Sequence, residues 1–143
     1  MKRNAIKTFL LFLLMLPVFS HSASAQEKRH RIVFAMTSPD EADWRLTMGN
    51  IRNLLGAFPP DSAEVEVVTY GPGLNMVKKS SSVEADVQAL QLLHVRFVAC
   101  EHTMQAQHVT LADLLKGLET VPSGVVEVVT RQEQGWSYIK AGR

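Results

Sequence analysis

The ten residues Val95–Met104, VRFVACEHTM, decide how the rest of this 143-residue chain is interpreted. An apolar run ends at Cys100 and a polar cluster follows it. This pattern predicts a buried strand that delivers a thiol to a loop, with a helix beginning at Thr103. Backbone N–H groups and the positive end of a helix dipole near the sulfur would both favour a thiolate. The alternative is a small core residue, because free cysteine is among the most buried residue types.

The first 25 residues have the three parts of a secretory signal peptide. Basic residues precede a short apolar core at residues 9–19, and Ala23-Ser24-Ala25 forms an A-x-A cleavage site. The apolar core is too short to span a membrane. We therefore expect cleavage after Ala25, a periplasmic or secreted protein, and no stable membrane anchor.

Cleavage would leave residues 26–143 as a single domain, long enough to bury a core without disulfides or metal ions. It would remove Lys2, Arg3 and Lys7 and so change the formal net charge from +1 to −2. A near-neutral chain without a basic run argues against nucleic-acid binding. Because the chain has one cysteine, Cys100 is a free thiol, an intermolecular link or a buried bystander.

Strand-like and helix-like segments alternate along the rest of the chain, with strands expected at residues 31–36, 63–70, 95–100, 125–130 and 136–139. Alternation of this kind predicts a three-layer α/β/α sandwich with a mainly parallel sheet. The flavodoxin-like order 2-1-3-4-5 is the commonest for five such strands. In that order Cys100, at the end of the third strand, would lie beside the loop after the first strand, where ligands bind.

Apolar residues at helical spacing predict a helix through Trp44, Met48, Ile51 and Leu55, capped by Ser38 or Asp40, and another over residues 83–93, with Val83, Val87, Leu90 and Leu93 on one face. A third is expected to begin at Thr110, with Asp113 completing a capping box, and to end at residues 121–124. Trp136 and Tyr138 are expected on one side of the last strand. Gly71 and Gly73 permit positive φ and close backbone approach, which suits a loop lining a site, although a tight turn alone would also explain them.

Four segments in order carry a resemblance to a known family: Tyr70-Gly71-Pro72-Gly73-Leu74, Val98-Ala99-Cys100 followed by Thr103-Met104, residues 121–127, and residues 134–139. Together they resemble the DsrE/DsrF-like family of sulfur-relay proteins, including its YchN-like and secreted single-domain members. The resemblance covers essentially the whole chain after residue 25. It implies a flavodoxin-like fold, self-association into trimers or hexamers, and a cysteine, here Cys100, that accepts and passes on sulfur as a persulfide.

Within the candidate site, His102 could stabilise the thiolate when protonated or take the thiol proton when neutral. Thr103 is expected to cap a helix whose N–H groups help hold an anion. Glu101 is expected to be a solvated loop carboxylate. The spacing of His94, Cys100, His102 and His108 matches no zinc signature, and no nucleotide-binding loop or Ser-His-Asp order follows a strand, so neither a metal nor a cofactor is predicted.

Two hypotheses follow. In the first, the chain is an exported sulfur carrier in which Cys100 takes sulfur from a donor protein and gives it to an acceptor, supported by His102, Thr103, Gly71 and Gly73. Such a carrier need not turn over a small substrate. In the second, it is a non-catalytic oligomeric module that binds a small ligand or serves assembly, and Cys100 is structural.

Overall fold

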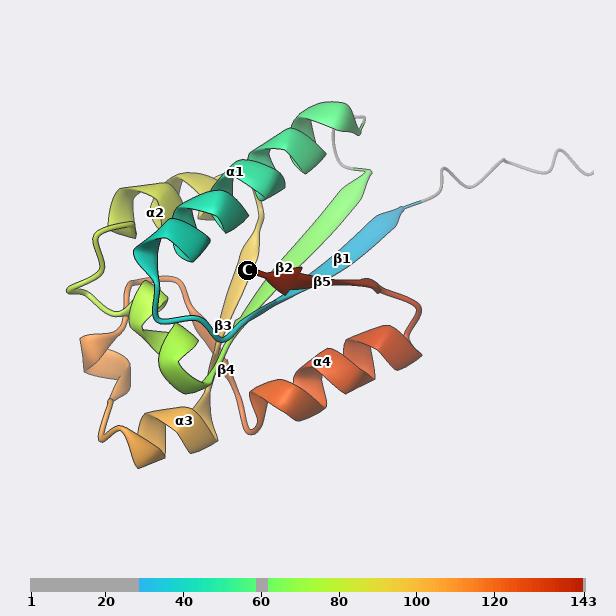
Figure 1. The fold of residues 1–143 in the computed structure, drawn as a ribbon. Coiled ribbons are helices and arrows are strands. Elements are labelled where there is room, and N and C mark those ends of the chain that lie inside the picture. Colours follow the sequence, from blue (N-terminus) through green and yellow to red (C-terminus); the bar gives the residue numbers. More distant parts are fainter. Residues whose placement is uncertain (1–28, 59–61, 143) are drawn as a thin grey trace, which may run out of the picture.

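Five parallel strands form a single sheet in the computed structural model, which describes residues 29–58 and 62–142 (Figure 1). The strands are β1 His30–Met36, β2 Ala63–Thr69, β3 Arg96–Cys100, β4 Glu119–Val121 and β5 Ser137–Ala141. Helices α1 and α2 cover one face of the sheet and α4 covers the other (Figure 1). The predicted α/β fold class with its five-stranded parallel sheet is confirmed, while the predicted signal peptide lies outside the described residues.

The order of the strands is β4-β3-β2-β1-β5, whereas the sequence had predicted 2-1-3-4-5. The two differ because β2 pairs with both β1 and β3, so the chain steps in one direction from β1 to β4 before α4 returns it to the other side of β1. The predicted crevice between the first and third strands therefore does not form. Cys100, at the end of β3, lies between the ends of β2 and β4 instead.

In the described part of the chain, four α-helices and two 3₁₀ segments connect the strands: α1 Glu41–Ala57, η1 Gly71–Val77, α2 Glu84–Gln91, α3 Glu101–Ala106, η2 Leu111–Asp113 and α4 Gly124–Glu133. Asp40 caps α1, and its carboxylate accepts a hydrogen bond from the Ala42 N–H at 2.8 Å. The predicted capping box of Thr110 and Asp113 is present, but it opens a single 3₁₀ turn instead of a full helix.

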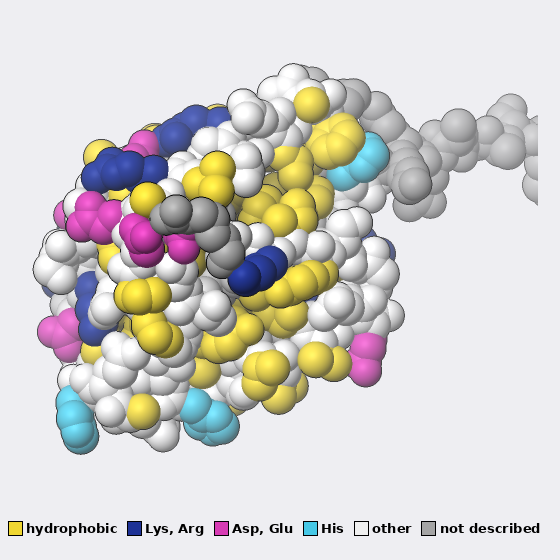
Figure 2. Space-filling view, viewed as in Figure 1, with side chains coloured by type: hydrophobic (Ala, Val, Ile, Leu, Met, Phe, Trp, Pro, Cys, Tyr) yellow, Lys and Arg dark blue, Asp and Glu magenta, His cyan; other side chains and the backbone are white. Residues whose placement is uncertain are grey.

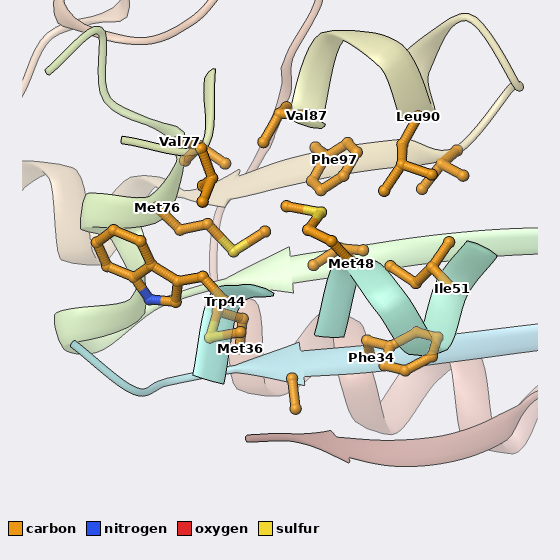
Figure 3. Close-up of a cluster of buried hydrophobic side chains, with 14 of the residues drawn as sticks. Phe34, Met36, Trp44, Met48, Ile51, Met76, Val77, Val87, Leu90 and Phe97 are labelled. Atoms are coloured by element: carbon orange, nitrogen blue, oxygen red, sulfur yellow. The ribbon is translucent and has the colours of Figure 1, made fainter. Parts of the chain in front are cut away.

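The larger core lies between the sheet and helices α1 and α2 (Figure 3). Trp44, Met48 and Ile51 of α1 are buried there, as their spacing predicted. Val83, Val87 and Leu90 are buried near α2, but Leu93 is 57% exposed, since α2 ends at Gln91. The predicted helical face was wrong at that last position.

The segment 125–130, predicted as a strand, is the middle of helix α4. Gly124 and Val128, four residues apart, face the sheet and are buried, while Val125, Val126 and Val129 are exposed. Residues 119–121 form the short strand β4, whereas the helix expected to begin at Thr110 was predicted to continue to residues 121–124. The surplus of β-branched residues in α4 misled the prediction, because valine is typical of strands.

The last strand begins one residue later than predicted, at Ser137. Trp136 precedes the strand and is buried under α4, where the Arg131 guanidinium lies 4.8 Å from its ring centroid. Tyr138 is exposed. The two aromatic side chains therefore do not share an environment.

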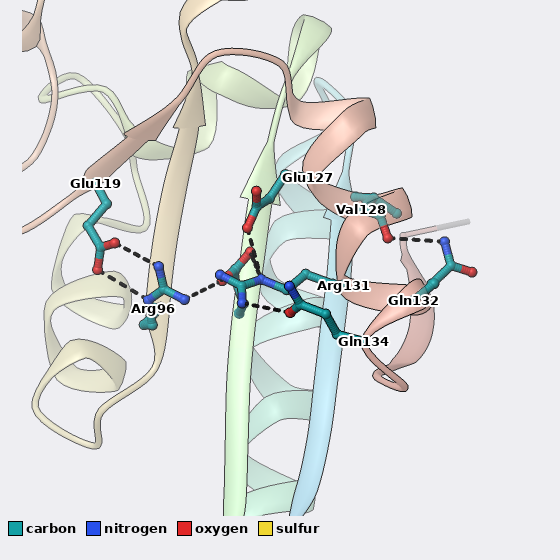
Figure 4. A network of polar contacts seen from close by, with 8 residues as sticks. Arg96, Glu119, Glu127, Val128, Arg131, Gln132 and Gln134 are labelled. Atoms are coloured by element: carbon teal, nitrogen blue, oxygen red, sulfur yellow. Dashed lines mark hydrogen bonds and ion pairs between the residues drawn. The ribbon is translucent and has the colours of Figure 1, made fainter.

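A charged network lies between the sheet and α4, centred on the fully buried Glu66 of β2 (Figure 4). Its carboxylate pairs with Arg96 of β3 at 2.6 Å and with Arg131 of α4 at 2.9 Å. Each arginine has a second carboxylate, Glu119 at 2.7 Å for Arg96 and Glu127 at 2.8 Å for Arg131. The network therefore joins α4 to three strands of the sheet, β2, β3 and β4.

Glu66→Gln is expected to lower the free energy of unfolding by about 2 kcal/mol, because glutamine replaces the charge-assisted hydrogen bonds that the Glu66 carboxylate accepts from Arg96 and Arg131 with weaker neutral ones. The loss of stability is no larger than this because Arg96 and Arg131 each keep another carboxylate. Urea unfolding measures it. Glu41→Gln, which removes an exposed pair with Arg45 on α1, is the control and should change stability by less than about 0.5 kcal/mol. Equal effects for the two variants would contradict the role given to Glu66.

Candidate functional site

Cys100 is both the last residue of β3 and the N-cap of α3, with 4% of its surface exposed. Beside it, β2 ends at Thr69 and the chain continues through Tyr70, while β4 contributes Val121 as its register partner. On the far side of a short loop from β4, helix α4 begins at Gly124. The thiol therefore lies at the carboxyl edge of the sheet, where two helices start.

The surroundings of the sulfur favour its ionised form. Burial raises the pKa of the Cys100 thiol, but the Thr103 hydroxyl and the backbone N–H groups of Gly124, Thr103 and His102 lower it more, because all of them hydrogen-bond to the sulfur. The net pKa lies below the usual value for cysteine. A buried thiol held by several donors can carry negative charge without a neighbouring cation.

Thr103 is the third residue of α3 and not its N-cap, because the helix begins two residues earlier than predicted, at Glu101. Its side chain bonds the sulfur and also accepts a hydrogen bond from the Gly71 N–H at 2.9 Å. Gly71 adopts φ +54°, a conformation that glycine reaches at little cost. Two residues predicted as supporting groups, Thr103 and Gly71, are thus connected to the thiol.

The structure places the remaining predicted site residues differently. The His102 side chain is exposed, and its backbone N–H donates to the Pro122 carbonyl oxygen at 3.3 Å and also helps to lower the pKa of the Cys100 thiol. Gly73 packs against the end of β1. Glu101 is half-buried and accepts a hydrogen bond from the Thr120 hydroxyl at 2.7 Å, so it is not the solvated carboxylate that was expected.

Two site residues were missed by sequence reasoning. The Gly124 N–H bonds the sulfur, and a Cβ at that position would come within 2.8 Å of the Tyr70 side chain, so Tyr70 packs directly on the start of α4. Burial, with the charges of Tyr138 and Cys100, raises the pKa of Tyr70, which keeps its hydroxyl protonated. Ser123-Gly124, taken as the end of a helix, was the available signal for the start of one.

Among residues 29–58 and 62–142, no group of three or more His, Cys, Asp and Glu side chains is arranged to hold a metal ion. In the same part of the chain, no helix has both the length and the apolar character needed to cross a membrane.

Alkylation of Cys100 by iodoacetamide is expected to show a midpoint below about 8.5, the ordinary pKa of cysteine, because the hydrogen bonds that lower the thiol pKa exist only in the folded protein. At high pH, where the thiol is fully ionised, the alkylation rate should still be slower than that of a free thiol, since the sulfur is buried. The rate measured against pH in native protein, with urea-unfolded protein as the control, tests both points. A native midpoint at or above the unfolded one would contradict the expectation.

The fold and the site define an α/β protein with a helix-capped cysteine at the carboxyl edge of a parallel sheet. The sequence model of the DsrE/DsrF-like family matches residues 19–141, and the chain belongs to this family, whose members generally take part in sulfur relay. Among solved structures it is similar to MTH1491, a protein of unknown function from Methanobacterium thermoautotrophicum. The two are 39% identical with a TM-score of 0.74, over 78% of this chain and 98% of that one. No curated protein matches.

Proposed function

We propose that this chain is an exported sulfur carrier that holds a persulfide on Cys100. The observation that carries the proposal is the position of Cys100, at the end of β3 and the N-cap of α3 and beside the start of α4. There the Thr103 hydroxyl and the N–H groups of Gly124 and His102 lower the pKa of the thiol. Membership of a sulfur-relay family supports it. A carrier needs a thiolate to accept sulfur, and this environment provides one without a metal ion or an internal disulfide partner.

The proposed transfer needs no oxidant. The Cys100 thiolate attacks the outer, sulfane sulfur of a donor persulfide, the sulfur–sulfur bond of the donor breaks, and its electron pair leaves on the donor thiolate. Cys100 then carries one additional sulfur as a persulfide anion. Attack by an acceptor thiolate on that outer sulfur returns Cys100 to its starting state. The N–H groups at the starts of α3 and α4 favour negative charge at each stage.

Incubation of the protein with a polysulfide, followed by intact mass and peptide mapping, tests the proposal. We expect a mass gain of one sulfur atom, located on the peptide that contains Cys100 and removed by a reducing thiol. Prior alkylation of Cys100 should block it. If native protein gains no sulfur while the urea-unfolded chain does, Cys100 is a packing residue and the alternative function, a non-catalytic binding or assembly module, would replace this one.

Export is part of this proposal and rests on the residues that precede Gln26. The mass of the protein purified from a host with an intact secretion pathway tests it. Loss of residues 1–25 is the expected result, and a full-length cytoplasmic product would contradict it.

We further propose that the chain forms a homo-oligomer, a trimer or hexamer as the family resemblance suggests. The support is an exposed apolar face on α4, made of Val125, Val126 and Val129 (Figure 2). Hydrophobic side chains gather along α4 in this view, and exposed apolar patches often mark protein–protein contacts. Light scattering at several concentrations measures the assembly, and a monomer throughout would refute this part of the proposal.

A further inference from the structure

A small pocket lies beside helix α3, which Figure 1 shows beyond the carboxyl ends of β3 and β4. Its volume is about 250 Å³. One face of α3, the residues just after that helix, and strand β4 supply its walls. The lining residues are Glu101, Met104, Gln105, Val109, Leu111 and Thr120. Cys100 is not among them, so the pocket is a second site next to the thiol.

The pocket forms because the chain turns back sharply after α3. Met104 and Gln105 follow Glu101 at helical spacing, so the three side chains share one face of the helix. His108 then adopts φ +55°, a conformation that is uncommon for residues other than glycine. Within this turn the Val109 N–H donates to the Met104 carbonyl at 2.8 Å. The chain after α3 therefore runs back beside the helix and closes one side of the pocket.

The Glu101 carboxylate is the charged group of this lining. It is half-buried, and its Oε1 accepts a hydrogen bond from the Thr120 hydroxyl at 2.7 Å. Among the residues that the structure describes, no lysine, arginine or histidine forms an ion pair with it. Glu66 and Glu127 beneath α4, by contrast, are both paired with arginine. Withdrawing a carboxylate from water without a cationic partner costs free energy, so the pocket favours a positively charged group.

The other walls are largely apolar. Met104 is buried, Val109 is half-buried, and Leu111 is 67% exposed. The capping box of Thr110 and Asp113 fixes the short turn that presents Leu111. Apolar walls suit an aliphatic stem. Long basic side chains combine such a stem with a charged end, so they match both parts of this lining.

The size of the pocket favours one side chain over a whole small molecule. Pockets for small molecules usually measure about 300–1,000 Å³, and this one is smaller. We propose that it docks a single lysine or arginine side chain of a partner protein. The partner is a sulfur donor or acceptor, and that part of the inference rests on the proposed function. Adjacent Cα atoms lie about 3.8 Å apart, so a side chain docked at Glu101 holds the partner at the edge of the sheet where Cys100 ends β3.

NMR titration of ¹⁵N-labelled protein tests the site. The probe is lysine with its α-amine acetylated and its carboxylate converted to the methylamide, so that only the side chain is charged. We expect saturable shifts of the amide signals around the pocket, with a Kd in the millimolar range. The same compound with its ε-amine acetylated should bind at least about threefold more weakly, because charge-assisted hydrogen bonds are the stronger ones. Added NaCl should also weaken binding of the charged probe.

Glu101→Gln removes the charge and keeps an oxygen that can accept from the Thr120 hydroxyl, so the Kd should rise by about threefold to tenfold in a folded protein. Leu111→Ser is a second variant for the case in which glutamine disturbs the fold. It shortens an exposed apolar wall and should raise the Kd about twofold. Glu133→Gln, which neutralises an exposed carboxylate on α4, is the matched control and should leave the Kd unchanged. Circular dichroism confirms folding for each variant.

Equal binding of the charged and acetylated compounds would overturn the inference, because the pocket would then accept apolar groups regardless of charge. An unchanged Kd in both pocket variants would also overturn it. Tighter binding of free lysine than of the blocked probe would assign the pocket to a small amine instead of a partner protein. Probe binding does not require sulfur transfer. If the parent binds the probe here but gains no sulfur from polysulfide, the proposed function fails while the docking site stands, and the opposite pair of results removes only the docking site.

Discussion

Cys100→Ser is expected to abolish sulfur uptake completely while leaving the fold intact. Serine replaces the sulfur with an oxygen that remains protonated and cannot form a persulfide. Its hydroxyl still offers an acceptor to the Gly124 N–H, and the His102 N–H donates to the Pro122 carbonyl with either side chain at position 100. We therefore expect no mass gain with polysulfide and a free energy of unfolding within about 1 kcal/mol of the parent.

Cys100→Ala is the informative comparison for this result. Alanine also prevents sulfur uptake, but it removes the acceptor that position 100 offers to the Gly124 N–H, at a site where the side chain is buried. An unsatisfied buried donor costs about 1–3 kcal/mol, so alanine should destabilise the protein more than serine does. Sulfur uptake that persists in Cys100→Ser would end the carrier proposal, since the chain has no other cysteine. Equal stability of the two variants would argue against the hydrogen bonds themselves.

The elements that followed from the sequence are those with a strong local signal. The apolar run into Cys100 predicted β3 because a strand covered on both faces needs little polar surface. The spacing of Trp44, Met48 and Ile51 predicted α1 because those side chains face one core. In both cases the apolar pattern along the chain exists because those side chains are buried in the core.

Helix α4 could not be predicted in this way, because its apolar residues do not all face the core. Val128 packs on the sheet, but Val125, Val126 and Val129 are exposed, so valines lie on both the core face and the solvent face and the segment reads as a continuous β-branched run. Burial of these valines between subunits of the proposed homo-oligomer would explain why apolar residues lie on the outer face of α4. The strand order was missed for a related reason: with α4 assigned as a strand, the chain offered no helix to cross to the opposite face before β5.

The site was predicted in part, and the missing part came from distant segments. Cys100, Thr103 and Gly71 were identified from residue type and position, but the link between Thr103 and Gly71 spans separate elements. The Gly124 N–H reaches the sulfur only because β4 is short and α4 starts directly after it. Contacts of this kind depend on strand order, which one sequence does not determine.

Gly73→Ala is expected to destabilise the fold by about 3–5 kcal/mol, among the larger effects of a single substitution. A Cβ at position 73 would lie 2.2 Å from the Met36 carbonyl oxygen and 2.9 Å from the Thr37 Cα, both of which are backbone atoms at the end of β1. No side chain can move aside to make room. The loop after β2 would have to separate from β1, which would also displace Gly71. Urea unfolding measures the loss.

Two other glycines provide controls that separate the effect of a steric clash at the new Cβ from the effect of an unfavourable backbone φ. Gly49→Ala, within α1 and with nothing within 4 Å of the new Cβ, should stabilise the protein by about 0.5–1 kcal/mol, the helix preference for alanine. Gly71→Ala has equal space but a positive φ, so it should cost about 1–2 kcal/mol. If Gly73→Ala costs no more than Gly71→Ala, the approach of the loop to β1 is looser than 2.2 Å implies. The alkylation midpoint of Cys100 should rise in Gly71→Ala and Gly73→Ala but not in Gly49→Ala, because only those two glycines belong to the loop that positions the Thr103 hydroxyl.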